Sequence, residues 1–495
     1  MVCRFLTFDE ILKTVSITDL VTPIQNGVSF HEMACLNRPT NDLGEQILSP
    51  TEQRKNLAAY ARWMVEHVGW EGFGVQNQQG FKRAVEHIWQ HIRHDMRADS
   101  FFQFVLQQAG QYILDNHCII ATGQNRMSGY HSNRHPQGVG QNLMKTSYRP
   151  DGYQLLSAEY CVSDARGMEK KLFAVHRHNR DKIRLPSDAR PIWEIGVMQH
   201  NQEKILVVSC ASLSFRPDYK RWKRFIKCFD VIYGQKGQKW DRLILDFRGN
   251  QGGEDKPIDH IARRTYGNDI NTFKRCEIRD TFLSNYALHT HGIFTRHLDK
   301  AVPELKRVCF SGGRTALFDE TKSYYAFNPQ QGYQGKINIL TDREVASAGE
   351  SVYTSFYHHP NVCYIGENTC GMQQFQQGNV HLPCGFLLRI GVTKLTYWDA
   401  QGENIECIGH APDIVCNGQD AFDVALKTTA TLPYHMLNEH KPVQQKQALN
   451  GYSPYYPQRP DIRQGFSTRT VVEALAGIEQ RNRQTIIQRR NNVTK

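Results

Sequence analysis

Apolar residues recur every three to four positions in the first quarter of the chain, which is the spacing of one face of an α-helix. Three runs share this spacing: 57–68, 81–92 and 100–114. Polar residues fill the positions between them, as expected for helices with one buried side. We therefore expect a small helical domain over residues 1–120.

Beyond about Ala121 the pattern changes to short apolar runs rich in β-branched and aromatic residues, which are typical of strands. The runs are KLFAVHRH, PIWEIGV, KILVVSCASLSF, RLILDF, INIL, VCYIG and FLLRIGV. Helical spacing returns from Pro217 to Gly234, between two of them. The order strand, helix, strand favours a mixed α/β layer with parallel pairing. We expect these runs to share one sheet system within a core over residues 121–433.

Charge is concentrated at the end of the chain. Of a net charge of +11, ten Lys or Arg against three Asp or Glu fall within residues 440–495. The rest is close to neutral, which argues against a nucleic-acid-binding protein. We interpret 434–495 as a basic linker and a C-terminal helix from Thr468 to about Arg489. We expect this amphipathic helix to dock on the body, with a partner protein or an anionic surface as alternatives.

Cysteine usage and hydropathy indicate the compartment. The 13 cysteines are scattered singly, without the two-residue spacing of a zinc or redox motif. The first residues carry acidic side chains and no uninterrupted apolar run before a cleavage site, and nowhere do about 18 apolar residues follow one another. We expect reduced thiols, no signal peptide, no membrane-spanning segment and a cytoplasmic protein.

The string DRLILDFRGNQGG, Asp241 to Gly253, is a strand that runs into two glycines. Without side chains, Gly252 and Gly253 let backbone N–H groups approach a bound anion closely. Taken alone, the string also fits a tight turn with a structural pair of Asp246 and Arg248.

A second string, INILTDREVASAGESVYTSFYHH, decides between these interpretations. Its small residues place Ser347 near the start of a helix, where unpaired N–H groups stabilise negative charge. An N-cap would be the ordinary role of such a serine. Together with the glycine turn, Ser347 instead fits a nucleophile that faces an oxyanion hole.

These strings resemble the tail-specific, C-terminal-processing serine peptidases, a family that includes the tricorn core protease. The match covers roughly residues 204–415. The family pattern Asp-x-Arg-x-Asn-x-Gly-Gly corresponds to Asp246 through Gly253, and the small-residue run with the serine corresponds to 346–350. GENTCG at 366–371 resembles the Gly-x-x-Thr-x-Gly turn, and GENIECIGHAPDI at 402–414 resembles the Glu-x-x-Gly-x-x-Pro-Asp block. The resemblance implies a spiral-sheet core like that of the crotonases.

One position departs from the family pattern. Members with a Ser-Lys dyad carry lysine directly after the Gly-x-x-Thr-x-Gly turn, where this chain has Met372. Methionine cannot accept the serine proton, so the resemblance points to the tricorn-like branch, in which an upstream histidine is the base. It implies His131 as base and Glu406 as the acid that holds it, with Ser132 or Tyr130 as a bridging hydroxyl.

Other bases stay open at this point. His117 and His135 are rivals in or near the same stretch, and Lys394 is an alternative on the FLLRIGVTK run. Histidine suits the task because its proton affinity lies near physiological pH.

The resulting hypothesis is a serine endopeptidase that hydrolyses extended peptides or unfolded protein termini through an acyl-enzyme on Ser347. The expected oxyanion hole comprises Gly252, Gly253 and Ala348. We expect no metal and no cofactor. No PDZ domain is expected, because residues 152–203 are too short for one. The alternatives are a catalytically degenerate peptide- or lipid-binding module on the same fold, and a scaffold that acts through the helical domain and the basic tail.

Overall fold

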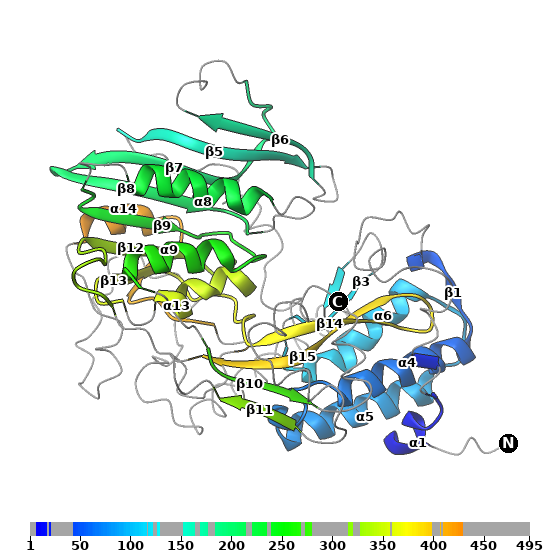
Figure 1. Ribbon diagram of the computed structural model, residues 1–495. Coiled ribbons are helices and arrows are strands. Elements are labelled where there is room, and N and C mark those ends of the chain that lie inside the picture. Colours follow the sequence, from blue (N-terminus) through cyan, green and yellow to red (C-terminus); the bar gives the residue numbers. More distant parts are fainter. Residues whose placement is uncertain are drawn as a thin grey trace. The chain divides into compact units, whose positions relative to one another are not determined.

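The computed structural model describes residues 6–16, 19–20, 43–115, 117–121, 126–128, 152–163, 169–176, 184–213, 220–234, 239–268, 273–279, 315–319, 327–356, 359–397, 406 and 409–428. They form two compact units, which we describe separately (Figure 1). The first unit draws on Met1–His135, Arg275–Glu320 and Gln374–Thr396, and the second on the remaining segments. The predicted tail, 434–495, lies outside the described residues, so its linker and helix stay predictions.

The first unit contains the predicted helices. They are α1 (Phe8–Leu12), α4 (Pro50–Val65), α5 (Val75–His91) and α6 (Ala98–Gln108), with 3-10 turns η2 (Leu43–Glu45), η3 (Glu71–Phe73) and η4 (Gly110–Tyr112). Helix α4 begins where Ser49 and Glu52 form a capping box, and Pro50 is its first residue. Its apolar face is fully buried, with Leu57, Ala61 and Met64 at 0% exposure.

A six-stranded sheet belongs to the same unit. Its strand order is β11-β10-β15-β3-β4, with β14 also on β15. The bounds are β3 (Ile119–Ala121), β4 (Arg126–Ser128), β10 (Phe273–Arg279), β11 (Thr315–Asp319), β14 (Phe375–His381) and β15 (Leu387–Tyr397). A separate pair consists of β1 (Ile47–Leu48) and β2 (Met96–Arg97).

The prediction that FLLRIGV joins the same sheet as the other runs is wrong, because this run forms β15 of the first unit. The N–H of Val68 donates to the Gly391 carbonyl at 2.9 Å. A Cβ at Gly391 would lie 2.5 Å from Nε2 of His67, so the helical segment packs directly on the strand. Period-two hydrophobicity shows that a segment is a strand, but it does not show which sheet the strand joins.

The second unit is built on an eight-stranded mixed sheet of order β16-β13-β12-β9-β8-β7-β5-β6. Neighbours from β16 to β8 pair in parallel, whereas β8-β7, β7-β5 and β5-β6 pair antiparallel. The bounds are β5 (Gln154–Ser163), β6 (Glu169–His176), β7 (Arg190–His200), β8 (Glu203–Cys210), β9 (Arg242–Asp246), β12 (Lys336–Thr341), β13 (Val362–Gly366) and β16 (Ile414–Val415). The predicted mixed α/β architecture is confirmed.

Helices cover both faces of this sheet (Figure 1). On one face lie α8 (Lys220–Tyr233), α9 (Lys256–Tyr266) and α13 (Ser351–Phe356), which share one apolar core with β7, β8, β9 and β12. On the other face lies α14 (Ala421–Lys427), whose Phe422 and Ala425 pack on Ile244 and Leu340. Because both faces are covered, the central strands read as continuous apolar runs.

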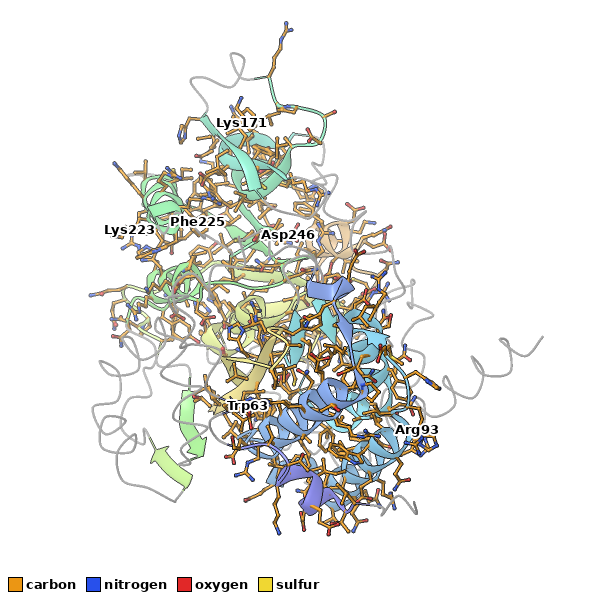
Figure 2. All side chains as sticks on the ribbon, turned by 90° about the vertical axis from the view of Figure 1, so that its right-hand side faces the viewer. Trp63, Arg93, Lys171, Lys223, Phe225 and Asp246 are labelled. Carbon is orange, nitrogen blue, oxygen red and sulfur yellow. The ribbon has the colours of Figure 1, made fainter. Side chains whose placement is uncertain are left out.

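Helix α8 shows how burial follows the pattern of the sequence. Phe225 is 0% exposed and contacts Trp193 with ring centroids 5.4 Å apart, whereas Lys223 on the same helix is exposed (Figure 2). No helix among the described residues is long and apolar enough to cross a membrane.

We expect Phe225→Ala to lower the free energy of unfolding by about 3 to 5 kcal/mol, because it leaves a cavity in a closely packed core. Val231→Ala, at a position 66% exposed on the same helix, is the matched control and should change stability by less than about 0.5 kcal/mol. Chemical denaturation measures both. Equal losses would show that α8 does not cover the sheet as described.

Candidate active site

The glycine turn begins where β9 ends, at Asp246. The guanidinium of Arg248 forms a two-point contact with the Asp246 carboxylate, Nε to Oδ1 at 2.8 Å and Nη2 to Oδ2 at 2.7 Å. Nη1 of Arg248 donates to the Gly418 carbonyl at 2.7 Å. The Asp and Arg of the motif thus connect the turn to the loop that precedes α14, which is the structural pair that the sequence allowed.

Asn250 and Asp342 fix the backbone of the turn. Both side chains are fully buried. The N–H of Gly249 donates to both carboxylate oxygens of Asp342 at 3.0 Å, and the side-chain amide of Asn250 donates to the Cys210 carbonyl at 2.7 Å. Oδ1 of Asn250 accepts the N–H of Gly252 at 2.8 Å. The Gly252 N–H is therefore already hydrogen-bonded within the turn. The role of Gly252 is to leave room for the serine turn, because it has no side chain.

The serine turn follows β12. Ser347 opens the 3-10 turn η7 (Ser347–Glu350), and α13 continues from it. Its φ of 54° is left-handed, a conformation that non-glycine residues adopt at a cost of about 1 to 3 kcal/mol and that surrounding contacts must hold. Its side chain is half-buried, while its neighbours Ala346 and Ala348 are buried and small.

The two turns lie against each other. A Cβ placed on Gly252 would lie 2.7 Å from both the Ala346 carbonyl oxygen and the Ser347 Cβ, and 2.9 Å from the Ala348 nitrogen. The N–H of Ala346 donates to the Asn250 carbonyl at 2.9 Å. Within the described residues, the N–H groups of Gly253 and Ala348 have no hydrogen-bond acceptor. The glycine turn thus packs against the serine turn at Ser347 and Ala348.

Three residues of the site matched family motifs in the sequence but were given no role there: Asn250, Glu350 and Thr369. Glu350 is fully buried, and its carboxylate accepts the hydroxyl of Thr369, the N–H of Gly371 at 2.8 Å and the N–H of Met372 at 2.6 Å. All three lie inside the matched motifs, so the signal was present as fixed polar positions next to glycines. Their contacts, however, depend on tertiary packing.

Met372 occupies an apolar environment. It clusters with Ala346 and Cys370, each at most 8% exposed. The apolar side chain of Met372 therefore lies among apolar neighbours.

The proposed partners of Ser347 are described only in part. Glu406 is described and is fully buried in the second unit. His131, His135, Tyr130 and Ser132 lie outside the described residues. The roles predicted for them stay predictions.

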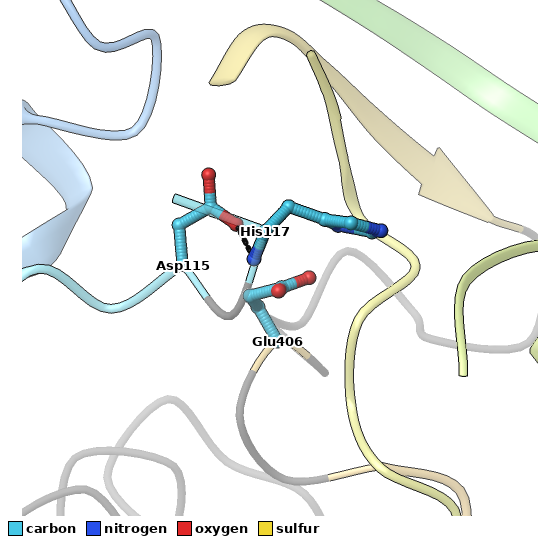
Figure 3. A group of neighbouring side chains, drawn as sticks. All are labelled: Asp115, His117 and Glu406. Carbon is cyan, nitrogen blue, oxygen red and sulfur yellow. Dashed lines mark hydrogen bonds between the residues drawn. The ribbon is translucent and has the colours of Figure 1, made fainter. Parts of the chain in front are cut away.

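Two alternative bases are described, both in the first unit. Lys394 lies on β15, opposite Phe375 of β14. His117 follows Asp115, whose Oδ1 accepts the His117 N–H at 2.7 Å (Figure 3). Burial lowers the pKa of His117 to about 4, against the opposing attraction of Asp115. His117 is therefore neutral at pH 7, the state in which an imidazole can accept a proton.

Asp115 also binds a second histidine. Nε2 of His67 lies 2.8 Å from Oδ2 of Asp115, and Nδ1 of His67 accepts the N–H of Gly69 at 2.9 Å. Both side chains of this pair are 0% exposed. With Nδ1 as acceptor, Nε2 carries the proton and donates to the carboxylate. Asp115 is thus held in place by one histidine while it orients the backbone of the other.

Residues 210–416 match the family model of peptidase family S41. This segment runs from the end of β8 past β16 and contains both turns. The matched residues are those that carry the sequence resemblance to the tail-specific peptidases.

Several solved structures are similar at low identity. A peptidase from Parabacteroides merdae is 14% identical, with 77% of this chain and 98% of that chain covered and a TM-score of 0.42. Mature CPAF in complex with lactacystin is 12% identical over 76% and 97%, with a TM-score of 0.44. The tricorn protease is 13% identical over 76% and 36%, with a TM-score of 0.33. The curated proteins give no match.

Gly252→Ala should lower the free energy of unfolding by about 1 to 3 kcal/mol or more, because it adds a Cβ against the serine turn at a φ of +96°. Gly72→Ala is the control, since a Cβ there meets nothing within 4 Å. Urea denaturation measures both variants. Similar stability for the two would contradict the close contact between the turns.

Asp342 makes stability depend on pH. Burial raises its pKa to about 7, while the Gly249 N–H opposes the shift. Because the carboxyl of an unfolded Asp titrates near pH 3.9, the folded state binds more protons between about pH 4 and 7, and the free energy of unfolding falls as pH rises through this window. Asp342→Asn should remove this contribution, about 1 to 3 kcal/mol, so the variant gains stability relative to wild type from pH 5 to pH 8. Denaturation at several pH values measures the difference, and parallel profiles would contradict it.

Proposed function

We propose that this chain is a serine endopeptidase that hydrolyses extended peptides or unfolded protein termini through an acyl-enzyme on Ser347. The observation that supports this most is the contact between the two turns. A half-buried serine in a left-handed conformation lies against Gly252, and a Cβ at Gly252 would lie 2.9 Å from the nitrogen of Ala348, the next residue after the serine. The S41 match over the same residues supports peptide-bond hydrolysis as the reaction.

The reaction begins with attack by Oγ of Ser347 on the carbonyl carbon of the scissile bond, while the base takes the hydroxyl proton. The oxyanion that forms accepts hydrogen bonds from the N–H groups of Gly253 and Ala348. One such donor contributes about 10²- to 10³-fold to the rate. Gly252, whose N–H is engaged by Asn250, leaves the space that lets the two turns approach.

Collapse of this intermediate breaks the C–N bond. The base returns its proton to the leaving amine, and the acyl group stays on Ser347. Water then attacks the ester, the base takes a proton from that water, and the carboxylic acid and the free Ser347 hydroxyl are released. All steps use protein groups and water alone.

We assign the base to His131, with Glu406 fixing its tautomer and Ser132 or Tyr130 as the bridging hydroxyl. Such support resembles the role of the acid in other triads. His117, which is neutral at pH 7, and Lys394 on β15 are the described alternatives. The extended substrate would pair with an exposed strand edge, a common mode of peptide recognition.

A fluorophosphonate probe and hydrolysis of unfolded casein test the proposal. Wild type should be labelled and should cleave casein, whereas Ser347→Ala should lose both. Ser100→Ala, at an exposed serine of α6, is the control and should behave as wild type. Labelling that persists in Ser347→Ala removes Ser347 as the nucleophile.

The base is identified by three variants, His131→Ala, His117→Ala and His135→Ala. Loss of general-base help should lower kcat by about 10²- to 10⁴-fold in the correct variant. We expect this loss for His131→Ala. If wild type binds casein without labelling or cleavage, the chain is a degenerate peptide-binding module on the same fold.

A further inference from the structure

Glu350 is a buried carboxylate that no step of the proposed reaction uses. It lies three residues after Ser347 and is 0% exposed. The described groups that bind its carboxylate are donors: the Thr369 hydroxyl and the N–H groups of Gly371, Met372 and Ser347. A buried carboxylate with several N–H donors is a strong, oriented contact, because charge-assisted hydrogen bonds are about twice as strong as neutral ones.

This carboxylate joins two segments that meet at the nucleophile. Glu350 belongs to the serine turn, whereas Gly371 and Met372 belong to the turn that follows β13. Before Ser347 in the chain, the carbonyl of Val345 accepts the N–H of Cys370 at 2.8 Å. The serine turn is therefore held to the 366–372 segment both before and after Ser347.

Thr369 orients the carboxylate and extends the connection. Its hydroxyl oxygen accepts the N–H of His410 at 2.7 Å while it donates to Glu350. The His410 ring stacks on Tyr353 of α13 with centroids 4.6 Å apart, and its Nε2 lies 2.8 Å from Oε1 of Gln373. Since the hydroxyl has one proton to donate, the His410 N–H directs that proton toward Glu350.

The backbone at Ser347 needs such support. Its φ of 54° is left-handed, and a non-glycine residue holds this conformation only where neighbouring contacts determine it. Gly252 packs against the backbone of the serine turn. The Glu350 carboxylate ties the same turn to the backbone of Gly371 and Met372.

We propose that Glu350 is a positioning residue for the Ser347 nucleophile, and that Thr369 sets the orientation of its carboxylate. This inference rests on the proposed function, in which Ser347 is acylated. Without the carboxylate, the serine turn loses its contact with 371–372. The Ser347 Oγ then no longer reaches the carbonyl carbon of a substrate whose oxygen is bound by the N–H groups of Gly253 and Ala348. A misplacement of about 1 Å at a reacting group costs about 10²-fold in rate.

Burial and hydrogen bonding act in opposite directions on the Glu350 carboxylate. Burial raises the pKa of Glu350 to about 7, and hydrogen bonds from Thr369, Met372, Gly371 and Ser347 oppose this shift. Glutamine has the same size, but its NH₂ group would face N–H donors that need an acceptor. Glu350→Gln is therefore a change of hydrogen bonding at constant volume.

Four variants test the inference: Glu350→Gln, Thr369→Val, Thr369→Ser and Ser347→Ala. The first measurement is the second-order rate of inactivation by a fluorophosphonate. The others are kcat and KM for a fluorogenic peptide with the sequence of a casein site that the wild type cleaves, and the midpoint of unfolding. Assays are run at a temperature where circular dichroism shows each variant to be folded. Thr369→Ser keeps the hydroxyl and is the matched control for Thr369→Val.

We expect Glu350→Gln to lower kcat and the inactivation rate by about 10²-fold with KM changed less than about threefold. Thr369→Val should lower both rates by about 10-fold, and Thr369→Ser should restore them to within about twofold of wild type. If Glu350→Gln does not fold, the Thr369 pair provides the same test, since valine and serine differ in the hydroxyl that binds the carboxylate.

Three results overturn the inference. Wild-type rates in folded Glu350→Gln, or equal rates in the two Thr369 variants, show that the carboxylate does not position the serine. A rise in KM with unchanged kcat shows a role in substrate binding. Equal labelling of wild type and Ser347→Ala removes the nucleophile itself, and this outcome separates failure of the proposed function from failure of the inference alone.

Discussion

The site depends on one steric constraint, the close approach of two backbone turns. Gly252 touches the Ala346 carbonyl, the Ser347 Cβ and the Ala348 nitrogen so closely that no side chain fits between them. Contact at this distance places the backbone of the glycine turn against the Ser347 side chain. It also limits the movement of Ser347, whose left-handed backbone would relax in open surroundings. Preorganised donors stabilise developing charge without reorganisation during a reaction, so this rigidity supports the proposed mechanism.

Buried acceptors keep the turns in this arrangement. Asp342 accepts the Gly249 N–H, Asn250 accepts the Gly252 N–H, and Glu350 accepts those of Gly371 and Met372. Each acceptor satisfies backbone groups that would otherwise be buried without a partner, which is costly in a protein interior. The cost of this solution is carboxylates with raised pKa values. The pKa of both Asp342 and Glu350 is raised to about 7, chiefly by burial.

The parallel part of the sheet explains why these groups meet. Strands β9, β12 and β13 are adjacent and parallel, so their carboxyl ends lie at one edge. The glycine turn follows β9, the serine turn follows β12 and the Gly-x-x-Thr-x-Gly turn follows β13. Binding and catalytic sites of open α/β sheets commonly lie at this edge. Motifs nearly 100 residues apart are thereby brought together by strand order alone.

Much of the fold could be predicted from the sequence, because periodicity reflects burial locally. The spacing of Leu57, Ala61 and Met64 predicted α4, and RLILDF predicted the buried strand β9. The site was predictable as far as motifs extend: Ser347, the two glycines and the structural pair of Asp246 and Arg248. Asn250 and Glu350 were not assigned roles, because a polar residue in a motif gives no indication of which backbone group it will bind.

The sequence by itself determined the local elements, the match of residues 210–416 to the S41 family model and the methionine at position 372 where Ser-Lys members carry lysine. Only the tertiary structure decided which sheet β15 joins, that the Gly252 N–H is engaged by Asn250, and that Glu350 binds the 371–372 backbone. The physical reason is the range of the interactions. Side-chain periodicity and turn chemistry act over a few residues, whereas sheet assignment and hydrogen-bond partners are fixed when distant segments pack and bury their polar groups together.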